Sequence, residues 1–207
     1  MKLTYKKGKG DKIHISIDGE YRITVDEMYF SSLYLKDGQE ISEEDYAKLE
    51  ETVKIRRAYN CAVSLLSRRD HSKKELLRKL TEKGYSDGAQ AAIQKLCDSG
   101  YISDERFCRL YASELVRLKG YGKRRIEQEL YRKGIDRDII QNVLEEISFD
   151  SDTLSGIIKK KYLSKMSDEK GRQKVFNALM RLGYSYGEIR DALKNIDEEI
   201  TCEVYDE

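Results

Sequence analysis

The first 25 residues and the rest of the chain differ in the period of their hydrophobic positions. Isoleucines alternate with polar residues from Ile13 to Ile17, an Asp-Gly pair follows, and the alternation resumes up to Val25. A period of two on both sides of Asp-Gly predicts a β-hairpin. Because a lone hairpin is only marginally stable, it must pack against the first helix or gain a third strand near Leu3 and Tyr5.

From Ser42 onward, apolar residues recur every three or four positions, which predicts helix over most of the remaining chain. Ser42 and Ser72 each stand three residues before an acidic residue, as in a capping box, and so predict two helix starts. The helix after Ser42 should be about 25 residues long, given the run of its apolar pattern. Helices are expected near residues 43–69, 104–118 and 152–166, each of them upstream of a repeated glycine-containing segment described next.

The glycine phrase occurs three times, centred on Gly84, Gly134 and Gly183, at intervals of 50 and 49 residues. Each glycine has a leucine four residues before it, an apolar residue directly after it, and a good N-cap residue two positions after it. This pattern is typical of a helix that ends in a left-handed glycine while the next residue folds back onto the leucine. Three copies at nearly constant spacing indicate tandem repeats.

These elements predict a mainly α fold, in which three tandem three-helix repeats form an elongated curved array behind a small N-terminal β-hairpin region. The N-terminal region should also contain the start of the first long helix. The expected boundaries are residues 1–52 for the N-terminal region, 53–101, 102–149 and 150–200 for the three repeats, and 201–207 for a tail.

Composition supports thin helical layers rather than one large core. Of the 207 residues, 37% are charged, none is Pro or Trp, and only four are Phe. No apolar run reaches the length of a signal peptide or a membrane span, so we expect a cytoplasmic protein that does not bind membranes. Cys61, Cys97 and Cys108 lie in apolar helical patterns and are expected to be small buried thiols.

No catalytic, cofactor or metal motif stands out. The four cysteines form no Cys-x-x-Cys pair, and the two histidines lie far from them in the sequence. The glycines at 8–10 and 120–122 lack the strand-to-helix context of a phosphate-binding loop. His71, between Asp70 and Ser72, cannot form a triad with its own sequence neighbours. We therefore expect no enzyme, no cofactor and no metal site.

Positive charge is concentrated in the middle of the chain. Residues 54–134 carry 20 Lys and Arg against 10 Asp and Glu, a net charge of +10, although the whole chain carries only +1. Internal ion pairs cannot absorb a two-to-one excess, so we expect a polyanion or an acidic protein surface to approach this region.

Basic residues also recur where the second helix of each repeat begins. Cations at a helix N-terminus oppose the helix dipole, so the fold alone would not select them, whereas an anionic partner would. We therefore predict a partner-binding surface. Its residues are Arg68, Arg69, Lys73, Lys74, Lys123, Arg124, Arg125, Arg132, Arg172 and Lys174.

Three segments resemble successive modules of the bacterial RecX family of regulatory proteins: LLSRRDHSKKELLRKLTEKGY, GYISDERFCRLYASELVRLKGYGKRRIEQELYRKGI and GRQKVFNALMRLGYSYGEI. The resemblance covers about residues 54–196. It implies three-helix repeats that bind in the groove of the RecA filament on single-stranded DNA and inhibit strand exchange and RecA's ATPase and coprotease activities. It supplies no catalytic motif, so the binding residues above rest on charge and position alone.

Two other functions stay open. The array could bind single- or double-stranded DNA directly, without RecA, or it could be a helical scaffold for another protein, which the charge asymmetry favours less. In each case we expect a monomer. Residues 159–171 depart from the family pattern and should lengthen the joint before the second helix of the third repeat.

Overall fold

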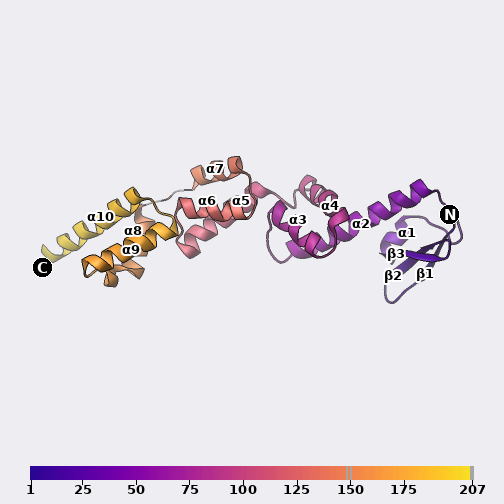
Figure 1. Ribbon diagram of the computed structural model, residues 1–207, viewed down its shortest axis with the longest axis horizontal. Helices are drawn as coiled ribbons and strands as arrows, with labels where there is room; N and C mark the ends of the chain where they lie inside the picture. Colours follow the sequence, from indigo (N-terminus) through magenta and orange to yellow (C-terminus); the bar gives the residue numbers. More distant parts are fainter. Residues whose placement is uncertain (148, 150, 206–207) are drawn as a thin grey trace. The chain divides into compact units, whose positions relative to one another are not determined.

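The computed structural model describes residues 1–147, 149 and 151–205, and the side chains of these except 151, 152 and 199–205. It is mainly α-helical, with a small sheet near the N-terminus (Figure 1). The chain divides into two compact units. Unit 1 comprises Met1–Arg69 and Leu76–Ser99, and unit 2 comprises Asp70–Glu75 and Gly100–Glu207.

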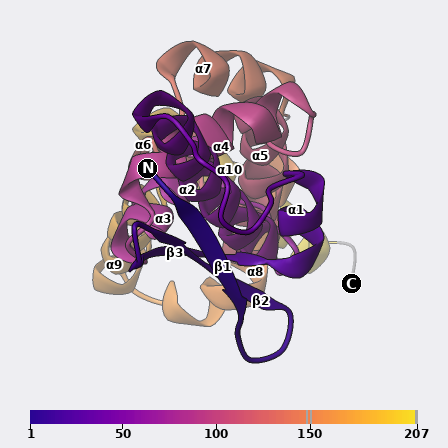
Figure 2. The same ribbon diagram turned by 90° about the vertical axis from the view of Figure 1, so that its right-hand side faces the viewer.

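Unit 1 begins with a three-stranded antiparallel sheet, which lies in the foreground of Figure 2. Its strands, in spatial order, are β1 (Leu3–Lys7), β2 (Lys12–Ile17) and β3 (Glu20–Asp26). The expected hairpin is therefore completed by a third strand, and its turn residues Asp18 and Gly19 both have positive φ, as the tight Asp-Gly turn requires. The isoleucines of β2 form a core with Leu3 and with Val53 of the following long helix. The hairpin therefore has both a third strand and a helix packed against it, the two alternatives that the sequence left open.

Unit 1 contains α1 (Glu27–Ser32), α2 (Glu43–Leu66) and α4 (Ser86–Asp98). Helix α3 (Lys73–Glu82) begins in the Asp70–Glu75 segment of unit 2 and continues into unit 1. Ser42 caps α2 as predicted, because its Oγ accepts the N–H of Asp45 at 3.0 Å. The predicted cap at Ser86 is wrong: this residue is already the first of α4, which has no side-chain cap.

Helices α2 and α4 pack closely against each other at Gly88. A Cβ on this residue would lie 2.5 Å from the carbonyl oxygen of Lys54 and 2.7 Å from the backbone nitrogen of Ile55, both on α2. The two helix backbones can therefore come this close only because Gly88 has no Cβ.

Replacing Gly88 by alanine should lower the free energy of unfolding by about 1–3 kcal/mol, because α2 must move away from α4. At an open helical position the same change should stabilise by about 0.5–1 kcal/mol. Gly156 supplies that control, since no described atom lies within 4 Å of a Cβ there. Thermal unfolding followed by circular dichroism should show opposite shifts for the two variants; a stabilised Gly88→Ala variant would contradict the close approach.

Unit 2 contains two helix triplets, each with its own hydrophobic core. The first consists of α5 (Asp104–Glu114), a π-helical turn η1 (Leu115–Lys119), α6 (Lys123–Arg132) and α7 (Arg137–Glu146). The second consists of α8 (Ser151–Lys161), a 3-10 turn η2 (Leu163–Lys165), α9 (Glu169–Leu182) and α10 (Tyr186–Tyr205). The helices expected near 104–118 and 152–166 thus change type or end early.

All three glycine turns have the predicted form. Gly84, Gly134 and Gly183 have φ of 82°, 77° and 96°. In each turn the N–H after the glycine donates to the predicted leucine carbonyl: Tyr85 to Leu80 at 2.9 Å, Ile135 to Leu130 at 3.3 Å, and Tyr184 to Leu179 at 3.3 Å. This is the hydrogen bond of the Schellman motif. The helix after Gly183 also has the predicted cap, because Ser185 and Glu188 bond each other's backbone N–H groups.

Two of these turns contact the start of an earlier helix within unit 2. Ser72 donates its hydroxyl to the carbonyl of Lys133 at 2.6 Å, next to Gly134. Gly122 donates its N–H to the carbonyl of Leu182 at 2.8 Å, next to Gly183. We call this contact between a helix start and a later glycine turn a joint. Residues 72 and 122 are 50 positions apart, so the joint repeats with the sequence phrase.

Candidate partner-binding surface

The predicted binding residues all lie in the described part of the chain, and all are exposed except Arg125, which is half-buried. Arg68 and Arg69 follow the end of α2 in unit 1. The others belong to unit 2: Lys73 and Lys74 at the start of α3, Lys123, Arg124 and Arg125 at the start of α6, Arg132 at its end, and Arg172 and Lys174 on α9.

The cations of α6 differ in whether they form ion pairs within the fold. Lys123 and Arg124 take part in none of the ion pairs formed within residues 1–147, 149 and 151–205. Arg125 instead pairs with Glu129 at 2.9 Å and lies under the Gly183 turn. Arg132 pairs with the same carboxylate at 3.1 Å. Two of the four cations on α6 therefore have partners within the fold.

The start of α3 contacts two residues of the second repeat, Asp104 and Gly134. Asp104, in the DERF segment, accepts the N–H of Lys73 at 2.8 Å, and burial raises the pKa of this carboxyl. Lys74 covers Gly134, where a Cβ would lie 2.7 Å from the Cβ of the lysine. The side chain of Lys74 therefore contributes to a joint, although its charge is exposed.

On α9, Arg172 donates two hydrogen bonds, at 2.8 and 2.9 Å, to the carboxylate of Asp197 on α10. This ion pair connects α9 to α10. The sequence prediction assigned Arg172 only a partner-binding role and did not foresee the pair. Lys174 instead lines a cavity of about 480 Å³. Lys165 and Lys170 line the same cavity. The sequence prediction missed both, because Lys165 precedes the repeated segment and Lys170 stands where the other repeats have His71 and Tyr121.

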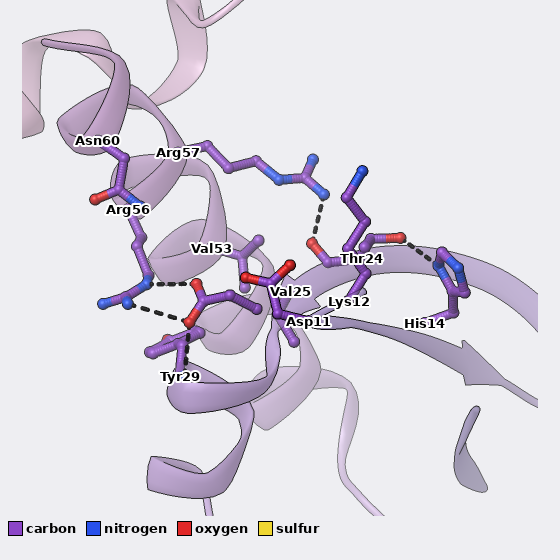
Figure 3. Close-up of a pocket in the computed structure, with 11 residues that line it drawn as sticks. Asp11, Lys12, His14, Thr24, Val25, Tyr29, Val53, Arg56, Arg57 and Asn60 are labelled. Atoms are coloured by element: carbon purple, nitrogen blue, oxygen red, sulfur yellow. Dashed lines mark hydrogen bonds and ion pairs between the residues drawn. The ribbon is translucent and has the colours of Figure 1, made fainter. Parts of the chain in front are cut away.

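A second cavity, of about 440 Å³, lies in unit 1 between the sheet and α2 (Figure 3). Asp26 accepts the N–H of Tyr29 at 2.8 Å and so caps α1, and it pairs with Arg56 at 3.3 Å. Arg57 crosses from α2 to β3 and donates to the carbonyl of Thr24 at 2.6 Å (Figure 3). These contacts fasten the sheet to α2, which explains the charged residues here without a ligand.

The pKa of Asp26 is lowered in the folded chain. Burial alone would raise it, but the Tyr29 N–H and the Arg56 guanidinium outweigh that effect. A carboxylate with a depressed folded pKa stabilises the fold above its unfolded pKa, about 3.9, and loses this contribution as the pH falls through the lower folded value.

Asp26→Asn should therefore be less stable than the wild type at pH 7, by about 1 kcal/mol or less, since the pair is partly exposed. Asparagine keeps the cap, so only the charge is tested. Urea unfolding at pH 7 and at pH 3 or below should show the difference shrinking as the wild-type carboxylate becomes protonated. A difference that does not change with pH would contradict a charge effect.

The predicted cysteines differ in burial. Cys108 is buried, and burial raises the pKa of its thiol to about 11. Cys61 and Cys97 are only half-buried, so their predicted burial is wrong in degree. No helix in the described residues is long and apolar enough to cross a membrane.

Two family models match the chain. The model for the first three-helix domain of RecX covers residues 58–96, and that for the second covers residues 103–144. Regulatory protein RecX of Caldanaerobacter subterraneus subsp. tengcongensis is 32% identical over 91% of this chain and 95% of its own length. Regulatory protein RecX of Bacillus subtilis strain 168 is 29% identical over 96% of this chain and 77% of its own length.

Solved structures agree with this relationship. A crystal structure of regulatory protein RecX matches with a TM-score of 0.66 and 23% identity, over 91% of this chain and 97% of the other. RecX from Lactobacillus salivarius matches with a TM-score of 0.60 and 25% identity, over 70% of this chain and 98% of the other. The 32% identity over 95% of the Caldanaerobacter relative, together with the two matched three-helix domains, shows that the chain belongs to the RecX family, whose members are regulatory proteins rather than enzymes.

Proposed function

We propose that this protein binds the RecA filament on single-stranded DNA and inhibits RecA's recombinase, ATPase and coprotease activities. Membership of the RecX family supports this function. The observation that carries it is the pair Lys123 and Arg124, two exposed cations without an ion pair in the described residues, at the start of α6.

The position of this pair is unfavourable for the fold. The first turn of α6 holds three cations and no acidic residue, and its N-cap, Gly122, offers no side chain to the free N–H groups. Each exposed cation there costs about 0.3–1 kcal/mol against the helix dipole. Ile126 and Leu130 hold the helix in the core. An external anionic surface would offset the electrostatic cost.

A repeat protein is suited to a filament, because both partners present similar surfaces at intervals. Lys73 and Lys123 stand at equivalent helix starts, so one mode of contact can occur more than once along the chain. Linked weak contacts of this kind raise overall affinity without any single strong site. A regulator without catalytic groups must act in this way, by binding one state of its target more tightly than another.

We infer that the protein acts as a monomer in the cytoplasm, where a DNA-bound RecA filament would be found. The start of α9 supports a monomer, because its backbone is satisfied without a contact from another copy of the chain. Gly171 occupies the position equivalent to Ser72 and Gly122, but its N–H is bound by Asp168 of the preceding loop, at 2.8 Å. The triplet α8–α10 therefore satisfies this backbone N–H group by its own N-cap.

The proposal is tested by titrating the protein into RecA assembled on single-stranded DNA while ATP hydrolysis is measured. Hydrolysis should fall to a low plateau as the protein is added. Unchanged hydrolysis at saturating protein would reject inhibition. The alternative, direct DNA binding without RecA, is favoured by one observation, the lysine-lined cavity beside α9.

A further inference from the structure

The cavity beside α9 is lined in part by the segment whose equivalents in the other repeats form the joints. Residues 71–75, 121–125 and 170–174 are equivalent in the repeat. The first two segments contact a later glycine turn, through Ser72 and Gly122. The third segment instead lines a cavity of about 480 Å³.

The loop before α9 explains why no glycine turn is needed there. A Cβ on Gly171 would collide with the carbonyl oxygen of Lys165 and lie 2.7 Å from the carboxylate of Asp168. These oxygens stand close to Gly171, as the Gly183 carbonyl stands close to Gly122. The backbone N–H of Gly171 is therefore satisfied by Asp168 within the triplet. The rest of the cavity wall is formed mainly by side chains.

Three of the eight residues that line the cavity are lysines. Lys165, Lys170 and Lys174 line the cavity and are exposed, and none of them forms an ion pair with a described residue. The one acidic residue in the lining, Asp168, already has one carboxylate oxygen bound to Gly171. Lys170 and Lys174 are four residues apart on one helix, a like-charge spacing that destabilises the helix. The fold does not explain this cluster.

The cavity also has an aromatic wall. Tyr162 is half-buried in the lining, and the ammonium group of Lys165 lies 5.7 Å from the centre of its ring. Cations that contact phosphates, next to an aromatic ring on which a base can stack, are the elements of a sequence-independent site for single-stranded nucleic acid.

We propose that this cavity binds the backbone of single-stranded DNA, with phosphate between Lys165, Lys170 and Lys174 and a base against Tyr162. The inference rests on the proposed function for the presence of DNA. It goes further in giving the triplet α8–α10 a DNA contact of its own, which operates without RecA.

The test measures fluorescence anisotropy of a labelled oligonucleotide of about 20 thymidines, without RecA, at several salt concentrations. The triple variant Lys165→Glu, Lys170→Glu, Lys174→Glu should bind at least about tenfold more weakly than the wild type. Because each phosphate contact contributes about 0.7 to the logarithmic salt slope on single strands, the slope should fall by about 2. Tyr162→Leu should weaken binding about fivefold or more with little change in slope.

The control variant Lys6→Glu, Lys9→Glu, Lys36→Glu has the same change in net charge at exposed positions of unit 1. It should keep the wild-type salt slope. Equal slopes for the two triple variants, or no binding by the wild type, would overturn the site. Assaying RecA's ATP hydrolysis with the same proteins separates the two proposals: inhibition without DNA binding rejects only the cavity, and DNA binding without inhibition rejects only the regulatory function.

Discussion

Replacing Gly122 by alanine should destabilise unit 2 by about 2 kcal/mol or more, although alanine is ordinarily a conservative replacement. Gly122 has φ of −80°, which any residue adopts, so the cost does not come from the backbone conformation. It comes from the joint. A Cβ here would lie 2.7 Å from the carbonyl carbon and oxygen of Gly183 and 2.8 Å from the nitrogen of Tyr184.

The two backbones must separate to admit the methyl group, and the hydrogen bond from Gly122 to Leu182 is then stretched. Urea unfolding followed by circular dichroism measures the loss. Gly187→Ala is a matched control on α10, where no described atom lies within 4 Å of a Cβ, and it should stabilise by about 0.5–1 kcal/mol. If Gly122→Ala were as stable as the wild type, the joint between α6 and the Gly183 turn would be refuted.

Reversing the charge of Lys123 and Arg124 together, as Lys123→Glu and Arg124→Glu, should weaken inhibition of RecA's ATP hydrolysis at least tenfold in protein concentration. A tenfold change corresponds to about 1.4 kcal/mol of binding free energy. Folding should be preserved, because both side chains are exposed and acidic residues suit a helix N-terminus. Arg125 is left unchanged, because it pairs with Glu129 and supports the joint.

The control is Lys6→Glu with Lys9→Glu, two exposed lysines of the N-terminal region with the same total change in charge. Lysines near residue 160 are unsuitable as controls because they lie close in sequence to the lysine-lined cavity. The control should inhibit like the wild type. Equal inhibition by both double variants, with circular dichroism confirming their folds, would remove Lys123 and Arg124 from the binding surface.

Much of the fold is readable from the sequence because its signals are local. The turns at Gly84, Gly134 and Gly183 each depend on a glycine, the leucine four residues earlier and the next residue, all within one short segment. Ser42 likewise caps a helix through a residue three positions away. Backbone conformation and nearest-turn hydrogen bonds determine such features, so a single sequence displays them.

The candidate surface was less predictable, because the use of each cation depends on residues distant in the sequence. Arg172 is bound by Asp197, 25 residues away, and the spacing of charges gives no sign of that pairing. The backbone N–H of Lys73 is held by Asp104, 31 residues away. Gly122 shows no sequence feature that distinguishes it from an ordinary loop glycine, although a Cβ there would collide with the backbone of Gly183. Long-range packing therefore decided which basic residues remained available to a partner.

Sedimentation of the protein with RecA filaments on single-stranded DNA, compared with the same DNA alone, tests recognition of the filament most directly. At a salt concentration that suppresses binding to bare DNA, the wild type should sediment with the filament, and the Lys123→Glu, Arg124→Glu variant should stay mostly in the supernatant. Wild-type protein that sediments equally with both, or with neither, would contradict recognition of the RecA filament.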